Sequence, residues 1–280
     1  MDGHGLVWLT LALFGVTVGV ASVALLLRER FWMRAAVVCL VAAFLAGTAV
    51  LAARWVEAGR PPFKTRYETL LLYPWCLAVV TLLLLGIHRL FVIVPFAALA
   101  SVFCLGYGLW NPDIELVLLP PALQSAWFVP HVVAYFVSYA GLLISCVLAA
   151  LAILNPSWCR EWGGATALPP GGGTGPVHEP LARHAHQAAV FGVTALTLGL
   201  VMGAAWGKFA WGDYWSWDPK ENWALVTWLA YMAYLHLARM PGWKGRRSAW
   251  LLVVSFGAVM FTWLGMHLLP TADNSLHVYQ

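Results

Sequence analysis

Apolar segments of about 20 residues recur along the whole chain, and they limit its possible folds more than any other feature. A helix needs about 20 mostly apolar residues to cross roughly 30 Å of hydrocarbon. Lipid leaves a single-chain span no other way to satisfy its backbone hydrogen bonds. The sequence therefore predicts an all-α, polytopic integral membrane helix bundle with about eight transmembrane helices. The expected spans are residues 6–27, 33–54, 69–87, 90–109, 127–154, 188–206, 223–240 and 248–269.

The composition excludes an ordinary soluble protein. Hydrophobic residues make up 61% of the 280-residue chain and charged residues 10%, against roughly 25% charged residues in a soluble domain. So few charges could not solvate a globule of this size, so most of the surface must face lipid. The net charge of +4 is consequently no sign of nucleic-acid binding. The five cysteines are far apart and form no CxxC pair, so neither a dithiol redox motif nor a zinc site is predicted.

The distribution of basic residues predicts which ends of the helices lie inside. With the N-terminus outside, the inner loops hold ten of the 16 Lys and Arg residues, and the outer segments hold six. The densest basic loop, residues 239–247, then lies inside, and both termini lie outside. The six outer basic residues are Arg54, Arg60, Lys64, Arg66, Lys208 and Lys220.

We expect the whole chain, residues 1–280, to form a single transmembrane domain with one long hydrophilic insertion. Residues 155–187 are rich in Pro and Gly and cannot build a core, so they predict a flexible inner loop. His178, His184 and His186 lie in this insertion, and exposure in a loop explains them better than a metal site does.

A tryptophan-rich segment, residues 206–223, is the most informative part of the chain. Its sequence is WGKFAWGDYWSWDPKENW, with five tryptophans in 18 residues. An interfacial aromatic belt accounts for scattered tryptophans at span ends, but not for this density. A dense aromatic surface with a few polar groups suits a large flat apolar ligand with a polar edge, such as a porphyrin with its carboxylates. The candidate ligand-binding residues are Trp206, Lys208, Trp211, Trp215, Trp217, Lys220 and Trp223, with the two lysines as partners of the carboxylates.

Asp218 marks the start of the seventh expected span. The run DPKE at residues 218–221 predicts a helix N-cap, a proline at the first helical position and an acid in the first turn. Asp218 would then hold the preceding tryptophans at a set angle to the helix. We therefore expect it to support a ligand site rather than to contact the ligand.

Two histidines are candidate ligands of a haem iron, and a third is a candidate functional residue within the membrane. His131, at the outer start of the fifth expected span, and His277, in the outer C-terminal tail, share the predicted face of the tryptophan-rich segment. Two neutral imidazoles can fill both axial positions of the iron. His236 lies inside the seventh span, where a polar ring is costly unless it faces the bundle interior. His267 is an alternative to His277 as a ligand. For His131 and His277, the other interpretation is an ordinary histidine of the membrane interface or the tail without a ligand role.

The sequence WGDYWSWDPKENW, residues 211–223, resembles the signature WGxxWxWDPKExW of the CcsA/ResC family. Members of this family are the haem-handling subunits of the system II cytochrome c synthase. Two further segments are similar to the same family: RWVEAGRPPFKTRYETLLLYPW at 54–75, and SLHVY at 275–279, where the family has GLHSY. The resemblance covers most of the chain from about residue 54 onward.

The resemblance implies a function in cytochrome c biogenesis. The chain would bind haem b, move it to the outer membrane face and present it for thioether attachment to the CxxCH motifs of apocytochrome c. It would be the haem-handling half of a cytochrome c synthase, without a side-chain acid or base as catalyst. His131 and His277 match the family's external haem ligands, and His236 matches a ligand of a second haem within the membrane.

The resemblance also implies partners and a location. A ResB/CcsB-type membrane subunit would supply the opposite ligand of the intramembrane haem. Apocytochrome c and a thioredoxin-like reductant of its thiols are the other implied partners. The implied location is the bacterial inner (plasma) membrane or the thylakoid membrane, with the haem site on the outer, periplasmic or lumenal face.

Two alternatives remain open. A haem exporter or chaperone of the CcmC type would deliver haem to another carrier without joining it to a protein. The DPKE run and the eight expected spans favour the synthase subunit over this alternative. A non-haem transporter, in which the tryptophans only anchor the protein, predicts a purified protein without colour.

Overall fold

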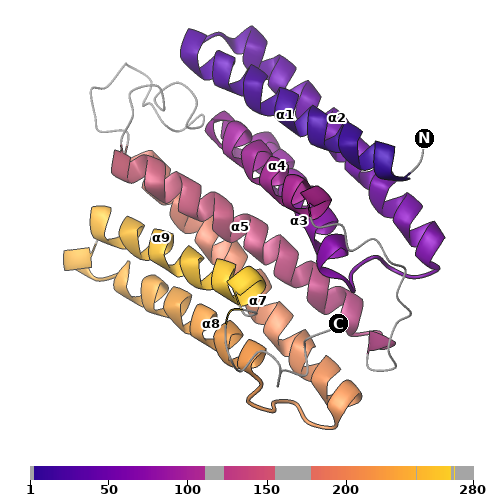
Figure 1. Ribbon diagram of the computed structural model, residues 1–280. Helices are drawn as coiled ribbons and strands as arrows, with labels where there is room; N and C mark the ends of the chain where they lie inside the picture. Colours follow the sequence, from indigo (N-terminus) through magenta and orange to yellow (C-terminus); the bar gives the residue numbers. More distant parts are fainter. Residues whose placement is uncertain (1–2, 111–122, 155–177, 244, 266–267, 269–280) are drawn as a thin grey trace. The chain divides into compact units, whose positions relative to one another are not determined.

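The computed structural model describes residues 3–110, 123–154, 178–243, 245–265 and 268. Within these ranges the chain forms eight α-helices and a few short 3₁₀ and π turns, and no residue there lies in a β-strand. The predicted all-α helix bundle is confirmed. Figure 1 shows these helices. The chain divides into two compact units.

Seven helices of the described residues are long and apolar enough to cross a membrane. The other long helix, α8 (Pro219–Leu237), has 19 residues and begins with the polar turn Lys220, Glu221 and Asn222. This turn lowers the mean hydropathy of α8, so composition alone does not mark it as a span. The protein is an integral membrane protein.

Unit 1 comprises residues 1–117 and 155–181. In this unit α1 packs along α2 and α4, and α3 also packs along α2 and α4. Arg89 ends α3 in a left-handed conformation, with φ at 54°. The predicted division of this region into two spans at His88 and Arg89 is therefore confirmed. The helices are α1 (Gly3–Leu27), α2 (Arg30–Ala58), α3 (Arg66–His88) and α4 (Val94–Trp110).

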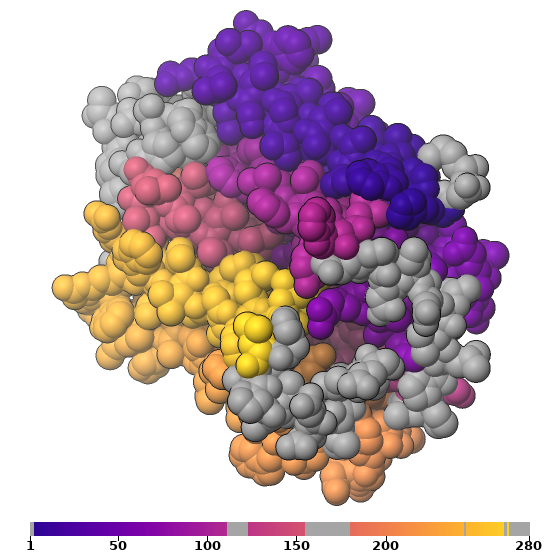
Figure 2. All heavy atoms as spheres, in the orientation of Figure 1, coloured from indigo at the N-terminus to yellow at the C-terminus, as the bar shows by residue number. Residues whose placement is uncertain are grey.

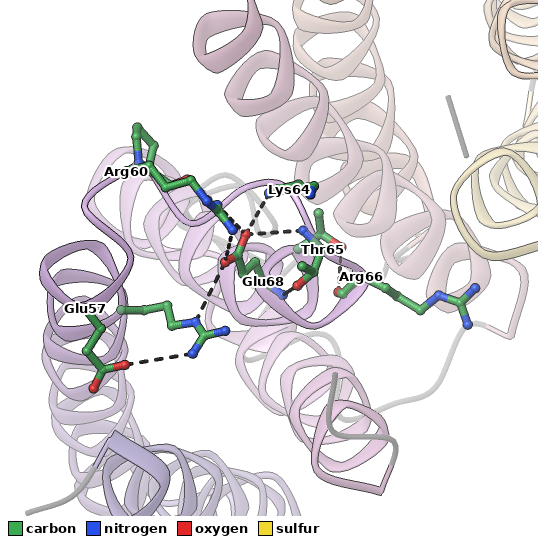
Figure 3. A network of polar contacts seen from close by, with 9 residues as sticks. Glu57, Arg60, Lys64, Thr65, Arg66 and Glu68 are labelled. Carbon is green, nitrogen blue, oxygen red and sulfur yellow. Dashed lines mark hydrogen bonds and ion pairs between the residues drawn. The ribbon is translucent and has the colours of Figure 1, made fainter. Parts of the chain in front are cut away.

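A buried carboxylate, Glu68, holds the connection between α2 and α3 (Figure 3). The Arg60 guanidinium donates two hydrogen bonds to it, each 3.0 Å long. The backbone N–H groups of Lys64 and Thr65 donate to the same carboxylate at 2.7 and 3.2 Å. The Thr65 hydroxyl accepts a hydrogen bond from the Glu68 N–H at 3.1 Å and completes a capping box. Arg54 Nε lies 3.7 Å from the carboxylate.

This network uses three of the six basic residues that we predict on the outer side. The side chains of Arg54 and Arg60 are 9% and 10% exposed, and Lys64 is also buried. These residues are part of the fold and not of an exposed basic surface. A count of outer basic residues therefore overstates the exposed positive charge on that side.

We predict that Glu68→Gln destabilises unit 1 strongly. The substitution keeps the shape of the side chain but removes the charge, so the Arg60 guanidinium stays buried without this carboxylate. Breaking a buried ion pair costs about 3–5 kcal/mol. The midpoint of thermal unfolding of the detergent-purified protein should fall accordingly.

Glu57→Gln is the matched control for this substitution. The Glu57 side chain is 49% exposed and lies 3.8 Å from Arg54. Removing such an exposed partner should change the unfolding free energy by less than about 1 kcal/mol. Equal unfolding midpoints for the two variants would show that the buried carboxylate does not hold the connection.

Unit 2 comprises residues 118–154 and 182–280. It contains α8 and most of α7, and α9 packs against both α5 and α8. Figure 2 shows the side chains of α8 and α9 as adjoining orange and yellow surfaces. The other elements are α5 (Phe128–Leu154), α7 (His178–Trp211), α9 (Arg246–Met260) and a π-helical turn, η4 (Phe261–Gly265).

Polar side chains join the helices of unit 2 to one another. The Ser138 hydroxyl of α5 donates a hydrogen bond to the Gly192 carbonyl of α7 at 2.7 Å. The indole N–H of Trp228 in α8 donates to the Thr197 hydroxyl of α7 at 3.0 Å. Lipid provides no hydrophobic drive for helix association, so such contacts and close packing hold membrane helices together.

The structure differs from the predicted inner loop at residues 155–187. Residues 155–177 lie outside the described residues, but α7 begins at His178, so the last ten residues of the expected loop are helical. His184 is 5% exposed, and Nδ1 of His186 lies 3.0 Å from the Tyr234 hydroxyl. The composition of this stretch predicts a loop, but residues 178–187 form a helix that packs against its neighbours. His184 and His186 are therefore not in an exposed loop.

The length of α7 explains how a helix can include part of a hydrophilic insertion. It has 34 residues and is about 51 Å long at 1.5 Å per residue. The hydrocarbon core of a membrane is roughly 30 Å thick. One or both ends of α7 therefore extend beyond the hydrocarbon.

Candidate functional site

His131 lies in the first turn of α5, and α7 holds its ring. The ring atom Nδ1 lies 2.8 Å from the carbonyl oxygen of Gly199. A carbonyl only accepts hydrogen bonds, so Nδ1 carries the proton, and the lone pair of the neutral ring is on Nε2. Metal-binding histidines use this arrangement, in which a backbone carbonyl holds the second ring nitrogen.

Aromatic side chains surround the ring of His131. Trp206 stacks on it with the ring centroids 5.6 Å apart and the planes at 29°, and Tyr135 meets it edge-on at 4.8 Å. Trp206 is 2% exposed and also contacts Phe128 and Trp211, at centroid distances of 5.6 and 4.7 Å. Trp206 therefore supports the histidine from inside the bundle and offers no open face to a ligand.

Two glycines of α7 make room for the side chains of α5 at this point. A Cβ atom on Gly203 would lie 2.5 Å from Cε1 and 2.7 Å from Nδ1 of His131. A Cβ atom on Gly199 would lie 2.6 Å from the ring of Tyr135. Neither position has room for a methyl group, so the close approach of the helices depends on glycine.

The tryptophan-rich segment is divided between two helices and the connection between them. Trp211 ends α7 and Pro219 begins α8, so residues 212–218 are not helical. The Asp218 carboxylate accepts a hydrogen bond from the backbone N–H of Lys220 at 2.8 Å. The predicted N-cap at Asp218, with proline at the first helical position, is confirmed.

Glu221, in the first turn of α8, ties the connection to the helix. Its Oε2 accepts hydrogen bonds from the N–H and the hydroxyl of Ser216, at 2.8 and 3.2 Å, and from the N–H of Asp218 at 3.2 Å. The side-chain amide of Asn222 donates to the Trp217 carbonyl at 2.9 Å. The sequence predicts Glu221 only as the acid of a helix cap, because its three bonds to the connection depend on the path of that connection.

Trp217 has an unusual backbone conformation between these anchors. Its φ angle is 59°, in the left-handed region that tryptophan rarely adopts. Such a conformation is costly and persists only where surrounding contacts impose it. The bonds of Glu221 and Asn222 supply those contacts, and the side chain of Trp217 is 70% exposed. The connection therefore presents this indole outward.

The other tryptophans of the segment have different environments. Trp215 meets Trp217 edge-on at 6.0 Å, and its Nε1 is buried with no hydrogen-bond partner among the described residues. A buried donor without an acceptor is destabilising. Trp223 packs on Phe261 of η4 at 4.3 Å. The indole N–H of Trp215 could therefore still serve an added acceptor.

The two lysines of the segment lie at helix ends. The Lys208 ammonium donates a hydrogen bond to the Gly212 carbonyl and lies 5.5 Å from the centroid of the Tyr214 ring. It thereby supports the C-terminal end of α7, where a cation is favourable. Lys220 is half-buried in the first turn of α8. Binding of a carboxylate ligand by either lysine stays a prediction.

His236 is the penultimate residue of α8, and it is exposed. The sequence favours an orientation toward the bundle interior for this polar ring, and in the described structure the ring does not adopt it. Tyr234, two residues earlier, is buried against α7, and two residues turn a helix by about 200°. The buried face of α8 consists of Ala224, Thr227, Tyr231 and Tyr234.

The remaining candidate ligands, His277 and His267, lie outside the described residues. Their distance from His131 therefore stays a prediction. Among the residues that the structure describes, no group of three or more His, Cys, Asp or Glu side chains could hold a metal ion by itself. The site has one histidine with its tautomer set, together with an aromatic segment from the same unit.

Comparisons with known proteins cover most of this chain. A family model described as cytochrome C assembly protein matches residues 64–272. The cytochrome c biogenesis protein CcsA of Synechococcus elongatus is 35% identical over 271 residues, covering 82% of this chain and 82% of the relative. The protein of the same name from Guillardia theta is 32% identical over 246 residues, covering 83% of this chain and 81% of the relative.

A solved structure has the same fold. The cytochrome c haem lyase CcmF aligns with a TM-score of 0.68 at 21% identity. The alignment covers 93% of this chain and 46% of the CcmF chain. At this identity the likeness is evidence of a shared fold.

We predict that Glu221→Ala loosens the connection between α7 and α8. Hydrogen bonds to a charged group contribute about 1.5–3 kcal/mol each. Amide hydrogen exchange at Ser216 and Asp218 should therefore become at least roughly tenfold faster. Deuterium uptake of peptides that cover residues 212–222 measures this change in the detergent-purified protein.

Asp213→Asn is the control for this substitution, because Asp213 is an exposed acid of the same connection. Removing the charge of Asp213 should leave the amide hydrogen exchange of Ser216 and Asp218 unchanged. Wild-type exchange in Glu221→Ala would mean that the connection keeps its conformation without the carboxylate.

Proposed function

This chain belongs to the CcsA family of cytochrome c biogenesis proteins, and we propose that it holds haem and presents it for attachment to apocytochrome c. The observation that carries this proposal is the ring of His131. The Gly199 carbonyl of α7 accepts a hydrogen bond from its Nδ1–H, and metal-binding histidines are held in this way. The tryptophan-rich segment belongs to the same compact unit.

His131 supplies one axial ligand of the haem iron in this proposal, and His277 of the outer tail supplies the other. His267 is the alternative to His277. All three lie on the outer face if both termini are outside. Two imidazoles on opposite sides of the porphyrin hold it with its edge open to a second protein.

The tryptophan-rich segment holds the porphyrin. The exposed indole of Trp217 offers a flat apolar surface, and the buried Nε1–H of Trp215 is a donor for a carboxylate of the porphyrin edge. Lys208 and Lys220 are further partners for these carboxylates. Trp206, Trp211, Trp223 and Asp218 support the site.

Apocytochrome c is the second substrate. The two thiols of its CxxCH motif add across the two vinyl groups of the porphyrin, and the histidine of that motif displaces one ligand of the iron. Addition of S–H across C=C conserves all atoms and needs no external oxidant. The protein's contribution is then mainly to hold thiols and vinyl groups in register. A thioredoxin-like protein keeps the thiols reduced beforehand.

His236 serves a second haem position within the membrane. Its face of α8 also carries Val226 and Leu229, which are 45% and 51% exposed. An apolar helix face with a single imidazole suits a haem that is shared with another membrane subunit. A ResB/CcsB-type partner provides the opposite ligand, and haem passes from this position to the outer site. The membrane is the bacterial inner membrane or the thylakoid membrane.

We predict that His131→Ala abolishes maturation of a reporter cytochrome c, and that His277→Ala does the same. Added imidazole should restore part of the activity, because it can occupy the vacant ligand position. The measurement is haem-stained cytochrome c in cells that depend on this protein and its partner subunit. His4→Ala is the control, since His4 bonds the indole of Trp8 in unit 1.

Three results, from the maturation assay and from absorption spectra of the purified wild-type protein, separate the hypotheses. Wild-type maturation in both variants would remove the two histidines from the site. A haem-loaded wild-type protein that cannot support attachment would favour an exporter of the CcmC type. A purified wild-type protein with no absorption from haem would favour a non-haem transporter.

We predict that His236→Ala lowers the haem that copurifies with the protein and its partner subunit severalfold. The substitution removes the imidazole of α8 and leaves the apolar face intact. Absorption spectra of the purified complex measure the haem content. Val254→Ala, at an exposed residue of α9 in the same unit, should keep wild-type haem content. Equal haem in the two variants would exclude His236 as a ligand.

A further inference from the structure

Contacts between α5 and α7 recur every seven residues along both helices. Three side chains of α5 lie 2.7 to 2.8 Å from carbonyl oxygens of α7. As the residue number increases along α5 it decreases along α7, so the helices are antiparallel. We call each of these contacts a rung. His131 pairs with Gly199, Ser138 with Gly192, and Ser145 with Ala185.

This spacing fixes the register of the two helices. A shift of one residue moves a side chain by 1.5 Å along the helix and by about 100° around it. Each carbonyl inside a helix already accepts a hydrogen bond from an N–H of its own backbone. A side chain of another helix can reach the same carbonyl only if the two helices come close together. The absence of a side chain at Gly192 and Gly199 permits this approach, since a Cβ on either would lie 2.6 Å from the side chain of Leu142 or Tyr135.

The ring of His131 is held by three positions on one face of α7. The Gly199 carbonyl holds Nδ1, the backbone of Gly203 lies against the ring edge, and Trp206 stacks on the ring face. These residues are at positions i, i+4 and i+7, which lie on the same side of a helix. These contacts with α7 therefore help to hold Nε2 in one direction.

We propose that Gly203 is a positioning residue for His131, and that the Ser138–Gly192 rung keeps Gly203 in register with it. The inference rests on the proposed function of His131 as an iron ligand. Gly203 acts by leaving space: any side chain there would push the imidazole away from its carbonyl partner. A ligand must be held within about 0.5 Å of its productive position, and the displacement would exceed that.

Gly203→Ala tests this proposal, with Gly141→Ala of α5 as the matched control. In Gly203→Ala the new methyl group meets the imidazole, whereas in Gly141→Ala it meets the ring of Phe191 in α7, whose Cδ1 would lie 2.8 Å away. Both substitutions crowd the same pair of helices. We expect cytochrome c maturation by Gly203→Ala to fall on the order of a hundredfold, as for a misplacement of about 1 Å.

Imidazole distinguishes a displaced ligand from a damaged fold. In Gly203→Ala, added imidazole should restore part of the maturation and the bis-histidine absorption spectrum of the purified protein, as in His131→Ala. In Gly141→Ala, any loss should not respond to imidazole. A second pair of variants adds no bulk: Ser138→Ala should show a severalfold, imidazole-responsive loss, and Ser145→Ala, one rung further from the ring, should not.

The outcomes separate the inference from the proposed function. If His131→Ala responds to imidazole but Gly203→Ala and Ser138→Ala do not, the positioning role is wrong and the ligand role of His131 stands. Wild-type spectra and maturation in Gly203→Ala also overturn the positioning role. If His131→Ala itself matures cytochrome c normally, both the ligand role and the inference fail.

Discussion

Close contact between the backbones of α5 and α7 is the constraint on which the candidate site depends. Within a membrane the lipid tails are as apolar as the side chains, so helices are held together by dense packing and polar contacts. Glycine at 192, 199 and 203 permits the packing, and side chains of α5 reach carbonyl oxygens of α7. His131 is one rung of this contact. The same interaction that joins the helices thus sets the tautomer of the candidate ligand.

Carboxylates at the starts of helices organise the connections outside the hydrocarbon. Glu68 and Glu221 are both the third residue of their helices, and both complete a capping box. Each also binds groups beyond its own helix: Glu68 binds Arg60, and Glu221 binds Ser216. A charged acceptor at a helix N-terminus is favoured by the helix dipole. It can therefore hold an irregular connection in one conformation, including the left-handed Trp217.

Much of the candidate site could be predicted from local sequence patterns. The tryptophan-rich segment, the N-cap at Asp218 and the position of His131 at the start of a helix all depend on neighbouring residues in the chain. Which of the tryptophans are buried and which are exposed could not be predicted in this way. Trp206 is buried behind a histidine of another helix, and Trp217 is exposed, because their environments depend on contacts far along the chain.

The sequence by itself determined the class of protein, because apolar runs long enough to cross a membrane leave the backbone no structure but the helix. It also determined the family, through a signature whose residues are contiguous. Only the tertiary structure decided that residues 178–187 are helical and that His236 points outward from α8. It alone supplied a carbonyl 68 residues away in the chain to hold Nδ1 of His131. These outcomes depend on which helices meet and at what register, and no single segment of the chain carries that information by itself.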